Sequence, residues 1–468
     1  MAEVDQTIHD ACGVVAVFLP EGDAARVAFF GIFSLQHRGQ ESAGITTVDS
    51  SGEFRNHKAL GLVSRVFDED ILAGLPGRLA IGHNRYSTTG SSTVANAQPI
   101  RAVGPGGELY LAHNGNVVNA ESLRRELLDM GVQFEGTTDS EVIAYLITHA
   151  SGDTWDERIA SAMRRLDGAY SMTIITQDAV YAARDPHGFR PLSYGRLNGG
   201  WIVASETCAL ENVGAKFERE VEPGEIFRID AGGVSSTIAR TARRSLCVFE
   251  YIYFSRPDSH LSGERVYLTR EAMGAQLARQ HPMEADLVTA IPDSAIAAGI
   301  GYAREAEIPF AETMVKNRYV GRTFIQPDQR LRDEGVRLKF TPLTEVIKGK
   351  RLIVVDDSIV RGTTTERVVN FLRSAGAKEI HLRVCAPPIK YPCHYGIDMP
   401  SRAELIASNR SIEETQVILG VDSLGYLDMP GLYSAIGQKM PGFCDACFTG
   451  KYPVPVQLEL DKFALERM

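Results

Sequence analysis

The hydrophobic pattern changes once along the chain, and this change restricts the possible folds more than any other feature. Before about residue 244, short apolar or alternating runs end in Gly, Asn or Ser, such as CGVVAVFL at 12–19 and SAGITTV at 42–48. Clustered strands with a few helices predict an α+β sandwich. Beyond residue 244, apolar runs alternate with helical patterns, as in RLIVVDD followed by a helix over 364–375. This alternation predicts an α/β domain with a parallel sheet.

Charge, cysteine content and apolar runs exclude several classes of protein. The 468 residues carry a net charge of -10, which argues against a nucleic-acid scaffold. Seven cysteines are too few for a secreted disulfide framework, and because their number is odd they could not all pair. No apolar run approaches the ~20 residues of a membrane span. Residues 1–11 contain no Lys or Arg and so resemble neither a secretory signal nor a transit peptide. We therefore expect a cytoplasmic protein without nucleic-acid or membrane partners.

The segment VVDDSIVRGTTT, residues 354–365, has the composition of a ligand-binding loop. An apolar parallel strand ends in two acids, and Ser, Gly and Thr residues then lead into a helix. Ligands of open α/β sheets bind at the carboxyl ends of the strands, and the N–H groups of a helix start cradle phosphate. Asp356 and Asp357 could hold sugar hydroxyls or a metal. The alternative is a plain strand–turn–helix connection with exposed acids.

This loop resembles the phosphoribosyl-diphosphate (PRPP) loop of type I phosphoribosyltransferases. The resemblance implies that Asp356 and Asp357 contact the ribose hydroxyls, and that Ser294 in AIPDSA joins them in binding Mg²⁺. The residues that it implies for the 5′-phosphate are Ser358, Arg361, Gly362, Thr363 and Thr364.

Cys12 opens the first apolar run and allows two interpretations. A free cysteine is most often a small buried core residue. Removal of residues 1–11 would instead make it an N-terminal nucleophile, whose own amine, with a pKa of ~7.7–8.0, could act as the base.

Five further motifs follow Cys12 in the first half: LQHRGQESAGI, GHNRYSTTG, LAHNGNVVN, GTTDSEV and RDPHGFRPL. Together with CGVV they resemble class II glutamine amidotransferases, whose N-terminal-nucleophile glutaminase domain is an αββα sandwich. The resemblance implies that Arg85 holds the glutamine α-carboxylate and Asp139 the α-amine. It implies that Asn114 and the Gly115 N–H form the oxyanion hole for attack by Cys12. Two donors aimed at the developing oxyanion are what such an attack requires. We interpret His83 and His113 as structural.

Cys247, Cys393, Cys444 and Cys447 remain, the last two in the CxxC of FCDAC. Their spacing alone leaves a metal site and isolated core thiols equally open. The segments around them resemble one branch of the glutamine–PRPP amidotransferase family, which carries a [4Fe–4S] cluster and an N-terminal propeptide. That resemblance implies that all four bind the cluster. It also implies a propeptide at 1–11, a glutaminase domain at 12–244 and a phosphoribosyltransferase domain at 245–468.

The family resemblance implies an enzyme of purine biosynthesis with two reactions. Glutamine would be hydrolysed to glutamate and ammonia, and the ammonia would displace pyrophosphate from C1 of PRPP to give 5-phosphoribosylamine, with Mg²⁺ as cofactor. The family further implies a homotetramer and feedback inhibition by purine nucleotides. The alternatives are another class II amidotransferase, whose members lack VVDDSIVRGTTT, and a regulatory protein that binds PRPP without catalysis.

Overall fold

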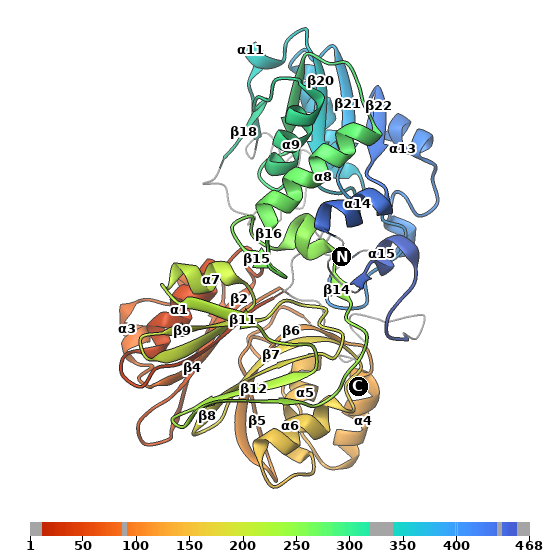
Figure 1. Cartoon of the computed structure of the whole chain (residues 1–468). Coiled ribbons are helices and arrows are strands. Elements are labelled where there is room, and N and C mark those ends of the chain that lie inside the picture. The colour runs from red at the N-terminus through yellow and green to blue at the C-terminus, as the bar shows by residue number, and fades with distance from the viewer. Residues whose placement is uncertain are drawn as a thin grey trace.

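The computed structural model describes residues 12–86, 91–317, 340–397, 399, 401–437 and 442–455, so residues 1–11 lie outside it. The chain forms a first half, which ends with β13 at Ile238, and a second half stacked on it, which begins with β14 at Leu246 (Figure 1). No helix in these ranges is both long and apolar enough to cross a membrane.

The first half is a sandwich of two antiparallel sheets. Their strand orders are β11-β9-β10-β1-β4-β2-β3 and β13-β12-β8-β7-β6-β5. Apolar side chains fill the space between the sheets, and helices cover both outer faces, so the predicted αββα sandwich is confirmed. The strands are β1 (Gly13–Phe18), β2 (Ser42–Val48), β3 (Phe54–Leu60), β4 (Leu79–Arg85), β5 (Ile100–Gly104), β6 (Gly107–Val117), β7 (Gly168–Ile175), β8 (Ala179–Arg184), β9 (Ser193–Leu197), β10 (Gly200–Ala204), β11 (Lys216–Glu220), β12 (Glu225–Asp230) and β13 (Gly233–Ile238). The helices are α1 (Ala24–Ser34), α2 (Val63–Val66), α3 (Glu69–Ala73), α4 (Ala120–Asp129), α5 (Asp139–His149), α6 (Trp155–Met163) and α7 (Thr207–Asn212).

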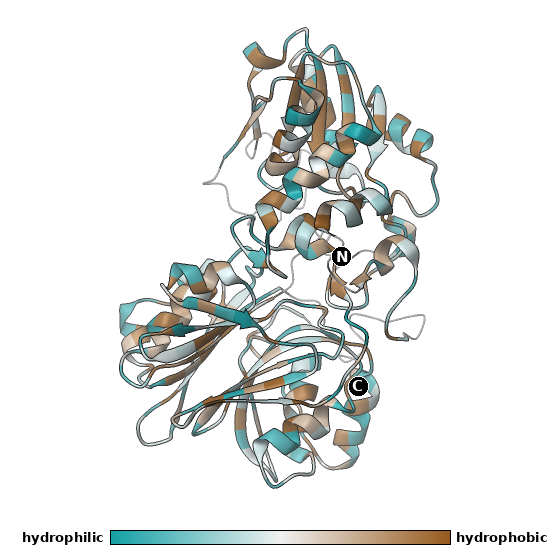
Figure 2. Ribbon diagram, in the orientation of Figure 1, coloured by the Kyte–Doolittle hydropathy of each residue, from teal (hydrophilic) through white to brown (hydrophobic). Residues whose placement is uncertain are grey.

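The second half is built on a parallel sheet of order β17-β20-β21-β22, as predicted. Side chains of β20 alternate between two cores: Ile353 packs on the side of α8 and α9, and Val354 on the side of α12 and α13. Figure 2 shows the apolar colouring of these inner strands. The strands are β14 (Leu246–Cys247), β15 (His260–Leu261), β16 (Glu264–Arg265), β17 (Leu287–Ala290), β18 (Met314–Lys316), β19 (Phe340–Pro342), β20 (Arg351–Asp356), β21 (Glu379–Val384), β22 (Ser423–Tyr426) and β23 (Phe443–Cys444). The helices are η1 (Glu250–Phe254), α8 (Val266–Gln280), α9 (Ile296–Ala306), α11 (Thr344–Ile347), α12 (Thr363–Ser374), η2 (Arg402–Glu404), α13 (Ile412–Leu419), α14 (Met429–Ile436) and α15 (Ala446–Thr449).

Local signals start the two helices that present predicted site residues. The Thr138 hydroxyl accepts a hydrogen bond from the Glu141 N–H at 3.3 Å, which caps α5 and places Asp139 in its first turn. Gly362 precedes α12 with a φ of 83°, a conformation that favours glycine. The first residue of each helix is therefore a predicted site residue.

Candidate functional site

Cys12 lies at the start of β1, between neighbouring strands β10 and β4. Because β4 runs antiparallel to β1, the end of β4 and the following Tyr86 lie beside Cys12. The Cys12 thiol is buried, donates to the Tyr86 carbonyl at 3.2 Å and accepts from the Tyr86 N–H at 3.4 Å. Burial raises the pKa of this thiol to about 11. A base is therefore required to form the thiolate near neutral pH.

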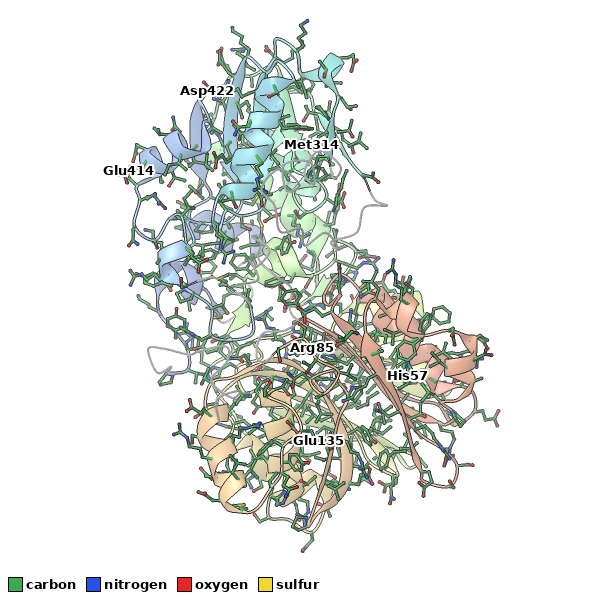
Figure 3. All side chains as sticks on the ribbon, turned by 180° about the vertical axis from the view of Figure 1, so that it is seen from behind. His57, Arg85, Glu135, Met314, Glu414 and Asp422 are labelled. Carbon is green, nitrogen blue, oxygen red and sulfur yellow. The ribbon has the colours of Figure 1, made fainter. Side chains whose placement is uncertain are left out.

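The residues predicted to hold the two ends of glutamine flank Cys12. Arg85 ends β4 where the first half meets the second (Figure 3), and its Nη1 donates to the Ser91 carbonyl at 3.1 Å. Asp139 is the first residue of α5, and its Oδ2 accepts from the Val117 N–H at 3.0 Å. Both side chains are buried, and both charges act on the Cys12 thiol. The structure thus brings a nucleophile, a cation and an anion together.

Asn114 and Gly115 are neighbours in β6, the strand expected to form the oxyanion hole. The Asn114 side chain is fully buried, and neither its Nδ2 nor its Oδ1 has a hydrogen-bond partner among the described residues. Gly115 has a φ of 147°, and a Cβ there would lie 2.0 Å from the Ala169 carbonyl oxygen. Because an unpaired buried amide is costly, this one is suited to a bound ligand.

The two histidines near Cys12 contact backbone carbonyls. His83 Nε2 lies 3.1 Å from the His113 carbonyl, and His113 Nε2 lies 3.4 Å from the Ala169 carbonyl. Burial lowers the pKa of His83 to about 3 and also lowers that of His113. Both rings are therefore neutral at physiological pH.

The paired acids of the second half lie where β20 ends. Asp356 accepts from the Asp357 N–H at 2.9 Å, and Asp357 accepts from the Ser358 hydroxyl at 2.6 Å. Ser294, from the turn before α9, also donates its hydroxyl to Asp357, so all three predicted Mg²⁺ residues are together. Burial, then the Asp357 charge, raises the pKa of Asp356 well above its usual range. A cation at this position would offset that unfavourable charge pair.

The residues predicted to form the phosphate cradle lie at the start of α12. Thr363 and Thr364 stand in its first turn, and the buried Thr363 hydroxyl has no hydrogen-bond partner in the part of the chain that the structure describes. Arg361, in the loop before the helix, is paired with Glu404 through Nη2 and Oε2 at 2.6 Å. The predicted cradle therefore combines the N–H groups of a helix start, which have no partner within the helix, with the Thr363 hydroxyl and a nearby cation.

Cys247, Cys393, Cys444 and Cys447 come together from distant parts of the second half. Cys247 and Cys444 are register partners in the parallel pair β14–β23, and Cys447 lies in α15 immediately afterwards. Cys393 packs against the same apolar clusters. Burial, then the charges of the other three cysteines, raises the pKa of Cys447 well above its usual range. Within the described ranges, no three His, Cys, Asp or Glu side chains are already arranged to hold a metal ion.

The loop that carries Cys393 also touches the predicted oxyanion strand. A Cβ on Gly396 would lie 2.6 Å from the backbone carbon of Gly115. Beside this contact, Asn116 Nδ2 donates to the His394 carbonyl at 3.0 Å. The backbone of the predicted oxyanion strand is therefore in direct contact with the loop that carries Cys393.

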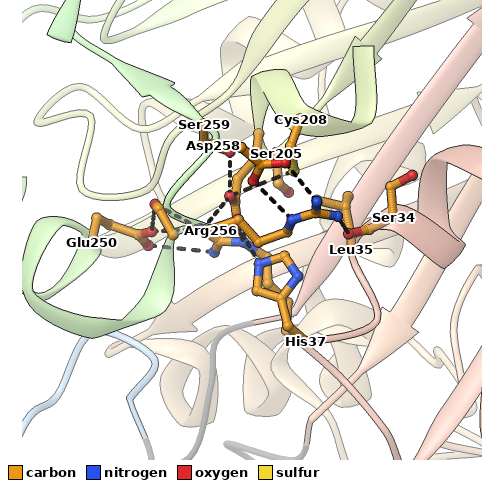
Figure 4. A network of polar contacts seen from close by, with 12 residues as sticks. Ser34, Leu35, His37, Ser205, Cys208, Glu250, Arg256, Asp258 and Ser259 are labelled. Atoms are coloured by element: carbon orange, nitrogen blue, oxygen red, sulfur yellow. Dashed lines mark hydrogen bonds and ion pairs between the residues drawn. The ribbon is translucent and has the colours of Figure 1, made fainter. Parts of the chain in front are cut away.

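A buried charge network joins the halves at a second place (Figure 4). Arg38, from the loop after α1, binds Glu206 of the first half and Glu250 of η1 in the second. Glu206 also accepts from the Ser259 hydroxyl at 2.6 Å and from the Arg256 N–H at 2.8 Å. Burial opposes ionisation of Glu206, yet Arg38 and His37 hold its pKa well below the usual range. The network is thus a charged contact between the halves.

Several of these contact residues were not predicted from the sequence. Glu41 Oε2 lies 3.9 Å from Arg85 Nη1, and Thr365 donates to Asp356 at 3.4 Å. Tyr86 and Asn116 were missed as well. All four lie within the motifs quoted above, and the available signal was a polar residue next to an already predicted one.

Comparisons with known proteins find a family model that matches part of each half. A family model described as a glutamine amidotransferase domain matches residues 83–212, and a phosphoribosyl transferase domain model matches residues 267–394.

Curated relatives named amidophosphoribosyltransferase match nearly the whole chain. That of Synechococcus elongatus is 49% identical over 98% of this chain and 94% of its own length. That of Mycobacterium tuberculosis is 48% identical over 98% and 90%, and that of Archaeoglobus fulgidus 48% over 95% and 98%. Among solved structures, an allosteric regulatory enzyme of purine biosynthesis has a TM-score of 0.91 at 45% identity, covering 96% of this chain and 97% of its own. The glutamine PRPP amidotransferase of B. subtilis, complexed with ADP and GMP, has a TM-score of 0.90 at 45% identity, with coverages of 96% and 98%.

Proposed function

The chain belongs to the amidophosphoribosyltransferase family, and on that premise we propose that it makes 5-phosphoribosylamine from glutamine and PRPP. The observation that carries this proposal is that each half of one chain holds, at its predicted site, a buried polar group that has no hydrogen-bond partner among the described residues. These are the Asn114 amide and the Thr363 hydroxyl. We assign residues 12–244 to the glutaminase domain and residues 245–468 to the phosphoribosyltransferase domain.

In the glutaminase reaction, the Cys12 sulfur forms a bond to the side-chain carbonyl carbon of glutamine. The thiol proton passes to the α-amine of Cys12 and then to the departing nitrogen, which leaves as ammonia. Asn114 Nδ2 and the Gly115 N–H donate to the developing oxyanion. Arg85 and Asp139 hold the α-carboxylate and the α-amine. Water then hydrolyses the thioester, which releases glutamate and restores the thiol.

In the transferase reaction, the ammonia nitrogen forms a bond to C1 of PRPP as the bond from C1 to the pyrophosphate oxygen breaks. Asp356 and Asp357 hold the ribose hydroxyls, and the start of α12 holds the 5′-phosphate. Mg²⁺, held by Asp356, Asp357 and Ser294, would neutralise charge on the pyrophosphate leaving group. The ammonium product loses one proton to give the neutral amine.

The test of this function is an assay with glutamine and PRPP that measures glutamate and pyrophosphate in the same sample. We expect the two products to form in a ratio near one, and each to depend on both substrates. Pyrophosphate release that is independent of glutamine and ammonia would contradict the proposal, and so would glutaminase activity with no turnover of PRPP.

We also infer that the four cysteines bind a [4Fe–4S] cluster. The pairing of Cys247 with Cys444 across β14–β23 supports it, and so does the half-buried Cys393, which packs against the apolar clusters that contain Cys444 and Cys447. In such a cluster each iron binds one thiolate. The four cysteine sulfurs therefore lie farther apart than they would around a single metal ion, to which each sulfur binds at ~2.3 Å. Anaerobically purified protein should contain about four irons per chain. Stoichiometric zinc without iron would contradict this.

The α-amine of Cys12 can serve as the base only if residues 1–11 are removed, so we propose that they form a propeptide. An intact mass that still includes Met1 or Ala2 in the active enzyme would contradict this. We further propose a cytoplasmic homotetramer inhibited by purine nucleotides. The nucleotide complex of the B. subtilis relative supports the inhibition. Sedimentation and inhibition assays with ADP and GMP test both statements.

A further inference from the structure

A loop of the glutaminase half, between β8 and β9, reaches the four cysteines of the other half. The Cys247 N–H donates to the Phe189 carbonyl at 3.1 Å. The Phe189 ring stacks on Tyr395, with centroids 4.5 Å apart and planes at 21°. The residue after Phe189 is Arg190, so this loop carries a cation into the cysteine group.

Arg190 is fully buried and only partly hydrogen-bonded. Its Nη2 donates to the Tyr395 carbonyl at 2.9 Å, and its Nη1 lies 3.3 Å from Glu250 Oε1. The Tyr395 N–H in turn donates to Cys393 Sγ at 3.3 Å. The Nε of Arg190 has no partner among the residues that the structure describes. A buried guanidinium N–H without an acceptor is costly. The thiols of Cys247 and Cys393 are close enough to interact electrostatically with this guanidinium.

We propose that Arg190 is a positioning residue for the iron–sulfur cluster, with its Nε–H available to the sulfurs around Cys247 and Cys393. This inference rests on the cluster in the proposed function. Four thiolates outweigh the positive charge of an oxidised [4Fe–4S] cube, so the loaded site is anionic. A fixed cation beside it favours both retention of the cluster and the addition of an electron. Glu250, the anion paired with the same guanidinium, has the opposite effect.

The test uses the full-length protein, purified anaerobically, with two oppositely charged changes. Arg190→Gln removes the cation, so the cluster's reduction potential should become more negative and the half-life of its visible absorption in air should shorten several-fold. Glu250→Gln removes the anion at nearly constant shape, so the potential should become less negative. Arg190→Lys keeps the charge but not the Nε–H. Its potential should stay near wild type while its half-life in air shortens.

Arg124→Gln is the matched control. Arg124 is also buried, and it too has guanidinium nitrogens without a partner in the described structure, but it lies in the glutaminase half against Phe134. Its replacement should leave the potential unchanged. Equal potentials in wild type, Arg190→Gln and Arg190→Lys, or shifts of the same sign in Arg190→Gln and Glu250→Gln, would overturn the role of Arg190. If Arg190→Gln does not accumulate, an unchanged half-life in Arg190→Lys, or a potential in Glu250→Gln that does not become less negative, would overturn the role of Arg190. Wild-type protein without iron would overturn the cluster itself, which is a separate result.

Discussion

Asn116 Nδ2 donates to the backbone carbonyl of His394 at 3.0 Å, which ties the oxyanion strand of the glutaminase half to the loop that carries Cys393. The residue before Asn116 supplies the predicted oxyanion N–H, and the residue before His394 is a predicted cluster ligand. Glutaminase geometry and the packing of the second half are therefore linked through one side chain.

Asn116→Ala should weaken that link without stopping either reaction. One hydrogen bond contributes about 0.5–1.5 kcal/mol, so glutamine-dependent synthesis should fall roughly 2- to 10-fold while ammonia-dependent synthesis is retained. Steady-state assays with each nitrogen source measure this. Asn119→Ala is the control, because Asn119 makes the same type of bond, to the Arg165 carbonyl at 2.8 Å, within the first half. Equal losses in both variants would count against a special role for Asn116.

Cys12→Ala should lower the rate of glutamine-dependent synthesis by a factor of about 10⁴ or more, because no other nucleophile forms the thioester. Ammonia-dependent synthesis should remain, since the second site is intact. Cys208→Ala removes another buried thiol, in α7, and should retain both activities. Loss of both activities in Cys12→Ala would contradict two separable sites.

Asn114→Ala should lower the glutaminase kcat by about 10²–10³, the usual effect of losing one oxyanion donor. Because neither amide atom has a partner in the described structure, the free energy of unfolding should change by no more than about 1 kcal/mol. Glutamate release and urea denaturation measure the two effects. A large loss of stability with unchanged kcat would place Asn114 in the scaffold instead.

Thr363→Val should raise the KM for PRPP by about 10- to 100-fold, since a hydrogen bond to a charged group contributes about 1.5–3 kcal/mol. Stability should be little affected, because the hydroxyl has no partner in the described residues. Thr415→Val is the control: its hydroxyl donates to the Ser411 carbonyl at 2.9 Å within α13, so only stability should respond. An unchanged KM in Thr363→Val would remove Thr363 from the phosphate site.

His83 should make the protein less stable in acid. Its pKa is about 3 in the folded protein, against ~6.5 when exposed. Between these values the unfolded chain binds a proton that the folded chain does not, so stability present above pH ~6.5 is lost as the pH falls. Relative to His83→Gln, the wild-type free energy of unfolding should fall by about 2 kcal/mol from pH 7 to pH 5. Urea denaturation at both pH values measures this, and parallel curves would contradict it.

Local patterns predicted much of the fold. The strand Ser42–Val48 has the predicted bounds, and the helix predicted at 364–375 forms at Thr363–Ser374, because their patterns of buried residues are encoded within a few positions. Helix α8 was not predicted: Arg270 and Gly274 interrupt its apolar face. A Cβ on Gly274 would lie 1.8 Å from the Ala298 carbonyl oxygen, so the glycine permits close packing on α9. That constraint comes from a partner helix and leaves no local signal.

The candidate site also had features that the sequence predicted and features that it did not. Cys12 and Asn114 were predicted, because each lies in a run of distinctive residues. Two features depend on pairing between remote segments: the Asn114 amide has no partner among the described residues, and Arg190 donates to the carbonyl of Tyr395, which itself contacts Cys393. Hydrophobic periodicity reports that a residue is buried but not what it is buried against.

The parallel pair β14–β23 has a consequence for biosynthesis. Cys247 and Cys444 are adjacent, although nearly all of the second half lies between them in sequence. A nascent chain emerges from its amino terminus, so the long-range closure of this pair must wait until the β17–β22 sheet and α14 have left the ribosome. The group of four cysteines is therefore completed last. A chain truncated before β23 would contain a folded glutaminase half but no β14–β23 pair. Occupancy of the four cysteines would thus mark chains that have been synthesised at least through Cys447.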